Sequence, residues 1–225
     1  DVAWGVEGDT PAFLSLIPNG LNESEHPEWG SWGGRYELYL PDFSKTKEGG
    51  SIVTIAPETR KIWTNANDSF SPHIEKEYGR TVKPDTVVFK GYKETLWRWR
   101  DDFQNDFAAR MDWCTQSYSE ANHPPVPVLS HPSQLTVKSG ENFNLDAFDS
   151  TDPDGDNLSF LWIYYGEEGT YKNEISMGAS NVHGVNLTAP KVNKKETLHF
   201  IVKVSDKGTP VLSRYERVIV TVVPK

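Results

Sequence analysis

A cluster of prolines in the middle of the chain limits its fold more than any other feature. The sequence Asn-His-Pro-Pro-Val-Pro-Val spans residues 122–128 and places three prolines within four positions. Proline fixes its own φ, lacks an amide proton and biases the residue before it towards extended backbone. A helix cannot cross this stretch, which favours a stiff, polyproline-like linker. We therefore expect two domains, over residues 1–121 and 133–225, joined by a linker over residues 122–132.

The chain after residue 133 alternates apolar and polar residues in short runs separated by turn residues. One run places Trp162 and Tyr164 on one face and Tyr165 on the other, where Tyr165 and Tyr171 either form a binding surface or cover the end of the fold. A period of two is typical of half-buried strands. About seven such strands in a domain of this size indicate an antiparallel immunoglobulin-like sandwich. The expected strands are 134–137, 143–147, 158–164, 174–177, 185–189, 198–204 and 218–222.

The first part of the chain is less regular. Residues 95–113 carry apolar side chains at steps of three and four, including Trp99, Phe103 and Phe107, which predicts one helix. Residues 51–55 and 61–63 are expected to pair as a hairpin. The predicted fold class is therefore α+β, with a mixed first domain followed by an all-β sandwich.

Composition excludes several kinds of partner. The net charge is −9, and the basic residues are scattered rather than gathered in runs. Nucleic acids and anionic membranes are bound by patches of Lys and Arg, so we expect neither as a partner. No apolar stretch approaches the roughly 20 residues that span a bilayer. The single cysteine, Cys114, allows no internal disulfide and is expected to be a small buried side chain.

The opening segment Glu7-Gly8-Asp9-Thr10-Pro11 brings two carboxylates and a hydroxyl close together. Asp9 and Thr10 offer the hard oxygen ligands that Ca²⁺ prefers. The same residues also suit a helix start, with Asp9 or Thr10 as the cap and Pro11 in the first turn. The two interpretations are compatible, because a capping loop can also hold a ligand.

A loop rich in glycine and tryptophan covers residues 26–36. Trp29 and Trp32 flank small residues there. Exposed indole rings can stack on the C–H faces of sugars, and glycine lets a ligand approach the backbone. The alternative is that buried tryptophans anchor the loop to its domain.

A second acidic loop covers residues 149–156. Asp152, Asp154 and Asp156 stand at alternate positions around a glycine and are candidate calcium ligands, with Asp206 from another turn as a further one. The loop lacks the glutamate that would complete an EF-hand. The alternative is a polar turn between strands.

Long segments of the chain resemble a bacterial family of nucleoside hydrolase-like proteins that is commonly labelled cellulose-binding. The resemblance rests on residues 7–21, 29–37 and 105–114 in the first part, and on residues 122–126, 146–156 and 162–171 in the second. It implies the end of a nucleoside hydrolase-like α/β domain over residues 1–121, followed by a C-terminal immunoglobulin-like domain.

The resemblance also implies a role for Asp9. Nucleoside hydrolases bind Ca²⁺ through a cluster of aspartates near the N-terminus and one further aspartate late in the domain, which Asp9 resembles. The N-terminal cluster is absent from this sequence. We therefore expect the chain to be the C-terminal half of a longer protein, with the N-terminal half as its partner.

Three functions follow as hypotheses. The first is a carbohydrate-associated, non-catalytic part of a secreted or periplasmic protein, with Glu7, Trp29, Trp32 and Arg35 as contacts to a carbohydrate or glycoside. The second is half of a Ca²⁺-dependent N- or O-glycoside hydrolase that uses a metal-activated water, with Asp9 as a ligand. The third is a calcium-binding adhesion module built on Asp152, Asp154 and Asp156.

Overall fold

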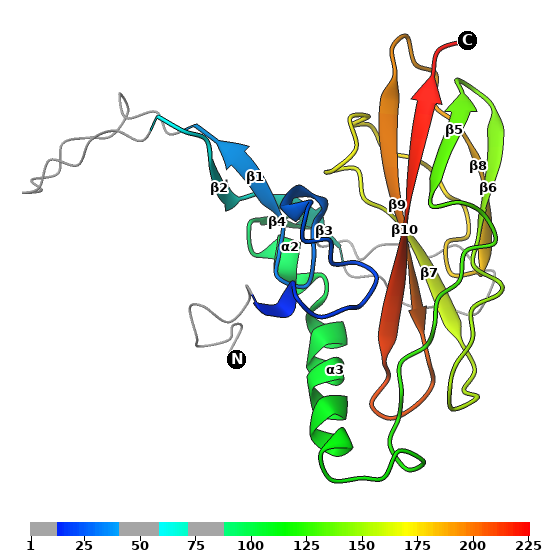
Figure 1. Cartoon of the computed structure of the whole chain (residues 1–225). Coiled ribbons are helices and arrows are strands. Elements are labelled where there is room, and N and C mark those ends of the chain that lie inside the picture. Colours follow the sequence, from blue (N-terminus) through cyan, green and yellow to red (C-terminus); the bar gives the residue numbers. More distant parts are fainter. Residues whose placement is uncertain (1–12, 41–58, 72–87) are drawn as a thin grey trace, which may run out of the picture.

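The computed structural model describes residues 13–40, 59–71 and 88–225 and is mostly β with few helices (Figure 1). Within these residues, the first part contains η1 (Pro27–Trp29), β1 (Tyr36–Tyr39), β2 (Ile62–Asn65), β3 (Asp68–Phe70), β4 (Phe89–Gly91), α2 (Glu94–Trp97) and α3 (Arg100–Trp113). The part after the proline-rich stretch contains β5 (Gln134–Lys138), β6 (Asn142–Asp146), β7 (Ser159–Tyr164), β8 (Gly184–Thr188), β9 (Glu196–Ser205) and β10 (Ser213–Val223).

Two sheets build the second part of the chain. The larger has the strand order β5-β10-β9-β7, and the smaller pairs β6 with β8. β5 runs parallel to β10, whereas the other pairs are antiparallel. The prediction of an entirely antiparallel arrangement is therefore wrong at β5, which pairs with the last strand rather than with β6. The finer immunoglobulin-like assignment stays a prediction.

One expected strand is missing. Residues 174–177 form a loop, from which Ile175 and Met177 pack against the hydrophobic core. Their apolar side chains are therefore buried without a sheet partner. The other expected strands are present, and Trp162 lies on β7, the third strand of this part.

The core between the two sheets follows from the alternation along the strands. Trp162 is fully buried there, and its indole Nε1 donates a hydrogen bond to the carbonyl of His183 at 3.2 Å. Both sheets contribute apolar side chains to this core, among them Leu145, Val185, Leu187, Leu198, Phe200, Val202, Val218 and Val220.

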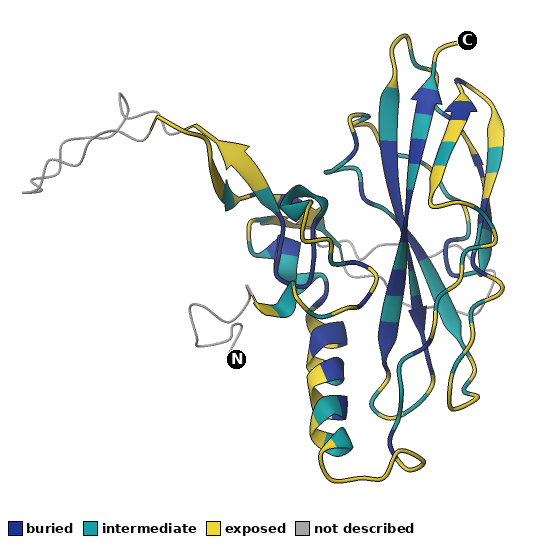
Figure 2. Cartoon of the chain, viewed as in Figure 1, coloured by how far each residue is buried: buried dark blue, intermediate teal, exposed yellow. Residues whose placement is uncertain are grey.

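The opposite face of the large sheet is buried as well, because the first part of the chain packs on it. Figure 2 shows long buried stretches on β9 and β10, and a second core joins the two parts. Tyr165 points away from Trp162, as the alternation predicts, yet it is 0 % exposed. It therefore cannot form the binding surface considered for it with Tyr171. This second core consists of Leu21, Trp32, Trp99, Phe103, Ile163, Tyr165, Ile201 and Tyr215.

The helix expected over residues 95–113 is divided into α2 and α3 at Arg98 and Trp99. Trp99 leaves helical geometry, with φ −109° and ψ 2°, and its ring is buried. The face of α3 towards the sheet combines charged and apolar side chains, because Asp102, Phe103 and Asp106 are buried, whereas Phe107 is 58 % exposed.

These aspartates have partners on the sheet. Asp102 accepts from the Tyr215 hydroxyl at 2.5 Å and pairs with the Lys203 Nζ at 2.6 Å. Asp106 pairs with Arg214 at 2.9 Å. The carboxylates thus attach α3 to β9 and β10, which the apolar periodicity did not indicate.

The expected hairpin between residues 51–55 and 61–63 stays a prediction. β2 pairs antiparallel with β1, so that Trp63 lies opposite Leu38. Residues 51–55 lie outside the described residues. The linker is attached to the second part of the chain, since Val126 forms a bridge with Thr151.

The exposure of Cys114 and the length of the helices bear on two further expectations. Cys114 is exposed, contrary to expectation, because α3 has already left the sheet where it ends. Among the described residues, every helix is too short or too polar to cross a bilayer.

Candidate functional site

An open groove of about 430 Å³ lies where the loop over residues 23–29 meets β5 and β10. Gln134 opens β5 opposite Ile219 of β10, and both line the groove. Its polar groups are two carboxylates, an imidazole, an amide, a hydroxyl and a guanidinium, which lie beside an indole ring. The complete lining is Glu23, Glu25, His26, Trp29, Ser133, Gln134, Arg217 and Ile219.

Trp29 is the aromatic platform of the groove. It ends the single turn of η1, where Pro27 fixes the first residue of the turn. The His26 imidazole stacks on the indole at 3.9 Å with only 4° between the planes, and the His26 Nδ1 is bonded to Glu28 at 2.8 Å. These contacts hold the Trp29 indole ring in one orientation.

Arg217 also contacts Trp29 and helps to hold it in place. The Arg217 Nη2 donates to the Trp29 carbonyl at 2.7 Å, and the guanidinium lies 5.6 Å from the centre of the indole ring. Burial lowers the pKa of Arg217 to about 10, against the raising effect of Tyr165 and Glu168. Arg217 thus stays a cation at neutral pH in the wall of the groove.

His199 lies behind Arg217 and is neutral. Burial and then the charge of Arg217 lower the pKa of His199 to about 3. Its ring approaches the Trp29 ring edge-on at 5.5 Å, and its Nδ1 lies 3.5 Å from Arg217 Nη1. A neutral imidazole can accept this hydrogen bond, whereas a protonated one would repel the guanidinium.

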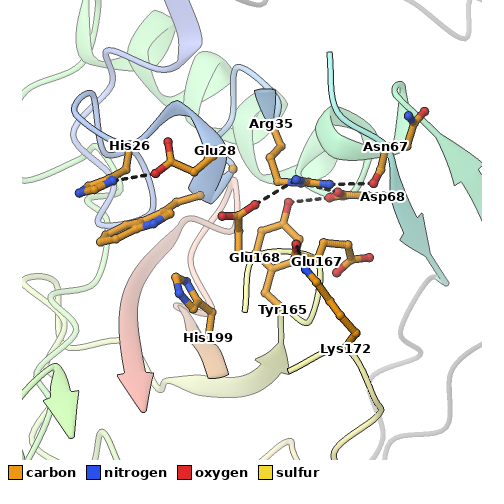
Figure 3. A network of polar contacts seen from close by, with 12 residues as sticks. His26, Glu28, Arg35, Asn67, Asp68, Tyr165, Glu167, Glu168, Lys172 and His199 are labelled. Carbon is orange, nitrogen blue, oxygen red and sulfur yellow. Dashed lines mark hydrogen bonds and ion pairs between the residues drawn. The ribbon is translucent and has the colours of Figure 1, made fainter. Parts of the chain in front are cut away.

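Glu168 connects the groove to a deeper ionic network (Figure 3). Its Oε1 accepts from Arg35 Nη1 at 2.9 Å. Burial nevertheless raises the pKa of Glu168 to about 7, because the loss of hydration exceeds the attraction of Arg35. This carboxyl therefore titrates near neutral pH.

The network centres on Asp68, which is 1 % exposed. Its carboxylate accepts from Arg35 Nε at 2.7 Å, from Arg98 at 3.0 Å and from the Tyr165 hydroxyl at 2.5 Å. Figure 3 shows Arg35 and Tyr165 converging on this carboxylate from the first and second parts of the chain. Because buried charges need partners on all sides, these bonds fix the two parts against each other behind the groove.

The two tryptophans of the loop have different positions. Trp29 lines the groove, as the sugar-stacking interpretation requires. Trp32 is 0 % exposed, and its Nε1 donates to the Tyr215 hydroxyl at 3.2 Å inside the second core. The prediction of Trp32 as a sugar contact is therefore wrong, and Trp32 anchors the loop instead.

Arg35 is also placed differently from the prediction. It is 8 % exposed, and Asp68, Glu168 and the Asn67 carbonyl accept its donors. It is a structural cation behind the groove rather than a contact to a ligand. Glu7 and Asp9 lie outside the described residues.

The acidic loop does not gather its carboxylates. Asp152 Oδ1 accepts the backbone N–H groups of Asp154 and Asp156, and Asp154 pairs with His123 at 3.0 Å. Within the described residues, no three His, Cys, Asp or Glu side chains are arranged to hold a metal ion. The polar-turn interpretation describes this loop better than the calcium loop does.

Sequence reasoning missed most of the groove. Glu23, Glu25 and Gln134 carry no motif, because only the fold brings them together. Arg217 stands in a valine-rich strand, on the face opposite Val218. A charge at that position usually indicates a face exposed to solvent, so the pattern gave no signal that this face is covered.

The comparisons with known families agree in both parts of the chain. Residues 142–222 match the model described as cellulose-binding protein Sde0182, C-terminal domain. Residues 1–36 match the model described as cellulose-binding Sde182, nucleoside hydrolase-like domain. Together the two matches cover about half of the chain. No curated protein matches it.

One solved structure is similar over nearly the whole chain. It is a nucleoside hydrolase-related hypothetical protein from Saccharophagus degradans that is associated with carbohydrate metabolism, with 30% identity and a TM-score of 0.72. The match covers 97% of this chain and 48% of that protein, so this chain spans about half the length of its relative. A sialyltransferase from Photobacterium damsela, at 13% identity, covers 40% of this chain and 17% of its own with a TM-score of 0.27, which carries no argument.

Proposed function

This chain belongs to the nucleoside hydrolase-like, cellulose-binding family in both of its parts, and on that premise we propose that it binds a polysaccharide in the groove beside Trp29 and is not catalytic alone. The observation that carries the proposal is the position of Trp29, a fixed indole in an open groove whose other groups are hydrogen-bond donors and acceptors. His26 covers one face of the indole, so a sugar ring would place its C–H face on the part of the indole that is left open and its hydroxyls towards the polar groups.

The lining suits a neutral sugar chain. Glu23 and Glu25 accept hydrogen bonds from hydroxyls, Arg217 donates them, and Gln134 does both. Ligand sites commonly combine an apolar wall with a few fixed polar groups. The groove is open rather than enclosed, so a polymer could lie along it.

Affinity electrophoresis in gels that contain soluble β-glucans, together with depletion by insoluble cellulose, tests the proposal. We expect the wild-type chain to be retarded and Trp29→Ala to lose most of that retardation. Trp63→Ala is the matched control, because Trp63 is 46 % exposed on β2 and does not line the groove. Equal retardation of Trp29→Ala and wild type would show that the groove is not the binding site.

A second candidate is the hydrolase half. It is favoured by the match of residues 1–36, which include Asp9, to a nucleoside hydrolase-like domain. In that case Asp9 would ligate Ca²⁺ together with residues of the N-terminal half, and Glu7 would contact the glycoside. A nucleoside hydrolysis assay with the complete parent protein and Asp9→Ala, with and without Ca²⁺, separates this candidate from a binding role.

The proposed ligand also bears on location. A polysaccharide from outside the cell does not cross the cytoplasmic membrane intact, so a protein that binds one has to be exported. We therefore propose a secreted or periplasmic location, which cell fractionation would test. The calcium-dependent adhesion module finds less support, since Asp152 and Asp154 are engaged within their own turn and with His123.

A further inference from the structure

The loop that follows α3 carries a stack of three aromatic rings at the surface, away from the groove. His123 is the middle ring: Tyr118 stacks on it with ring centres 3.8 Å apart and 27° between the planes. Trp113, at the end of α3, lies nearly parallel to His123, at 6.2 Å and 9°. None of the three lines the groove described above.

Hydrogen bonds hold His123, Trp113 and the turn that bears Tyr118. The His123 backbone N–H donates to Asp154 Oδ2 at 2.6 Å, and its ring Nδ1 lies 3.0 Å from Asp154 Oδ1. The Trp113 Nε1 donates to the Asn122 carbonyl at 2.7 Å. In the turn itself, Ser117 Oγ donates to Glu120 at 2.6 Å. The turn that bears Tyr118 is therefore ordered without any contact to its outer side.

Tyr118 is nevertheless 73 % exposed. His123 supports one face of its ring, so the exposure falls on the other face and the edges. Keeping a large ring in water forgoes the stabilisation that burial of such a side chain gives. A ring that is exposed and also oriented in advance loses little conformational entropy when a flat ligand stacks on it.

The surroundings select the class of ligand. The same turn exposes the Ser119 hydroxyl and the Glu120 carboxylate, which can bond to hydroxyl groups. The acidic chain as a whole disfavours anionic ligands such as nucleic acids or uronate polymers. A neutral sugar offers both a C–H face for the ring and hydroxyls for the edge.

We propose that Tyr118, supported by His123 and Trp113, is a second sugar-stacking subsite that contacts neutral polysaccharide independently of the groove at Trp29. The proposal rests on the same class of ligand as the proposed function, but it involves different residues. Two separate subsites on one chain would raise retention on a polymer beyond the affinity of either one, because the second contact forms at high effective concentration.

Depletion by insoluble cellulose and titration with cellohexaose test the subsite. We expect Tyr118→Ala to lower the partition onto cellulose about threefold to tenfold, the range for loss of one aromatic contact. Tyr118→Phe keeps the ring and should stay within about twofold of wild type. Tyr92→Ala is the matched control, since Tyr92 is 51 % exposed on another loop. Thermal unfolding of each variant verifies that the fold is intact.

His123→Ala distinguishes a fixed platform from a lone exposed ring. If His123 positions Tyr118, removal of the imidazole should weaken binding about as much as Tyr118→Ala, and the double variant should add little. Equal binding by Tyr118→Ala and wild type would overturn the subsite while leaving the groove in place. Loss in Tyr118→Ala with none in Trp29→Ala would overturn the groove and keep the subsite. No binding by the wild type would overturn both.

Discussion

Glu168 and His199 face the same buried network, and their pKa values are shifted in opposite directions. Burial raises the pKa of Glu168 from 4.5 to about 7, against Arg35 and Arg217, with Glu28 adding to the rise. Burial lowers the pKa of His199 from 6.5 to about 3, helped by Arg217, Lys172 and His26. Between pH 4.5 and 6.5 the native state therefore holds a proton on Glu168, and the unfolded state holds one on His199.

The two effects cancel in the wild-type chain. A raised carboxyl pKa gives stability that is present below the unfolded pKa of 4.5 and is lost as pH rises towards 7. A lowered imidazole pKa does the opposite, since the unfolded state gains the proton as pH falls below 6.5. Each process changes the free energy of unfolding by about 1.4 kcal/mol per pH unit, with opposite signs. The pair then contributes almost no slope across this window.

Single substitutions reveal how each group alone makes the free energy of unfolding depend on pH. We expect Glu168→Gln, which can still accept from Arg35, to lose about 2–3 kcal/mol of stability relative to wild type when pH falls from 6.5 to 4.5. His199→Asn should gain a similar amount over the same range. Urea unfolding at four or five pH values measures both, and groups that titrate alike in all three chains cancel in the comparison.

The reasoning would be refuted by a particular outcome. If Glu168→Gln showed the same pH dependence as wild type, the Glu168 carboxyl would be ionised throughout the window in the native state. The attraction of Arg35 would then exceed the cost of burial. A titration of Glu168 followed by NMR would show this directly as a midpoint at or below 4.5, its ordinary value.

Two further predictions concern the contact between the two parts of the chain. Trp32→Ala removes a fully buried ring and its bond to Tyr215, and should cost about 3–5 kcal/mol in urea unfolding; a loss below 1 kcal/mol would contradict its anchoring role. Asp102→Asn leaves Lys203 and the Tyr215 hydroxyl without their buried carboxylate and should cost about 2–4 kcal/mol. The neighbouring control Asp101→Asn, at a side chain that is 88% exposed, should stay within about 0.5 kcal/mol, and equal losses would argue against the buried ion pair.

The strands after the proline-rich stretch could be predicted because their signal is local. Alternation along β7 placed Trp162 and Tyr165 on opposite faces, and the structure has them so. What covers the Tyr165 face could not be read from the same pattern, since it comes from the first part of the chain, including Trp99 and Phe103. No signal in the sequence indicated the buried positions of Asp102 and Asp106 for the same reason, because aspartates usually face solvent.

The candidate site could be predicted only in part. Trp29 and Trp32 are three residues apart in one loop and carry the same sequence signal, yet Trp29 lines the groove and Trp32 lies in the core. The difference arises from the turn at Gly30, whose φ of +79° and close approach to the Tyr165 ring leave no room for a side chain. The family resemblance was right, because it rests on long segments rather than on single residues.

A sheet with cover on both faces has a practical consequence for anyone who divides this gene. The proline-rich stretch looks like a natural place to cut, but a fragment that begins there would leave Ile201, Tyr165 and Tyr215 facing water, together with the unpaired charge of Arg217. Such a fragment would tend to aggregate through that apolar face. The β-rich part is therefore a poor choice for fusion or transplantation by itself, and residues 13–40, 59–71 and 88–113 belong with it.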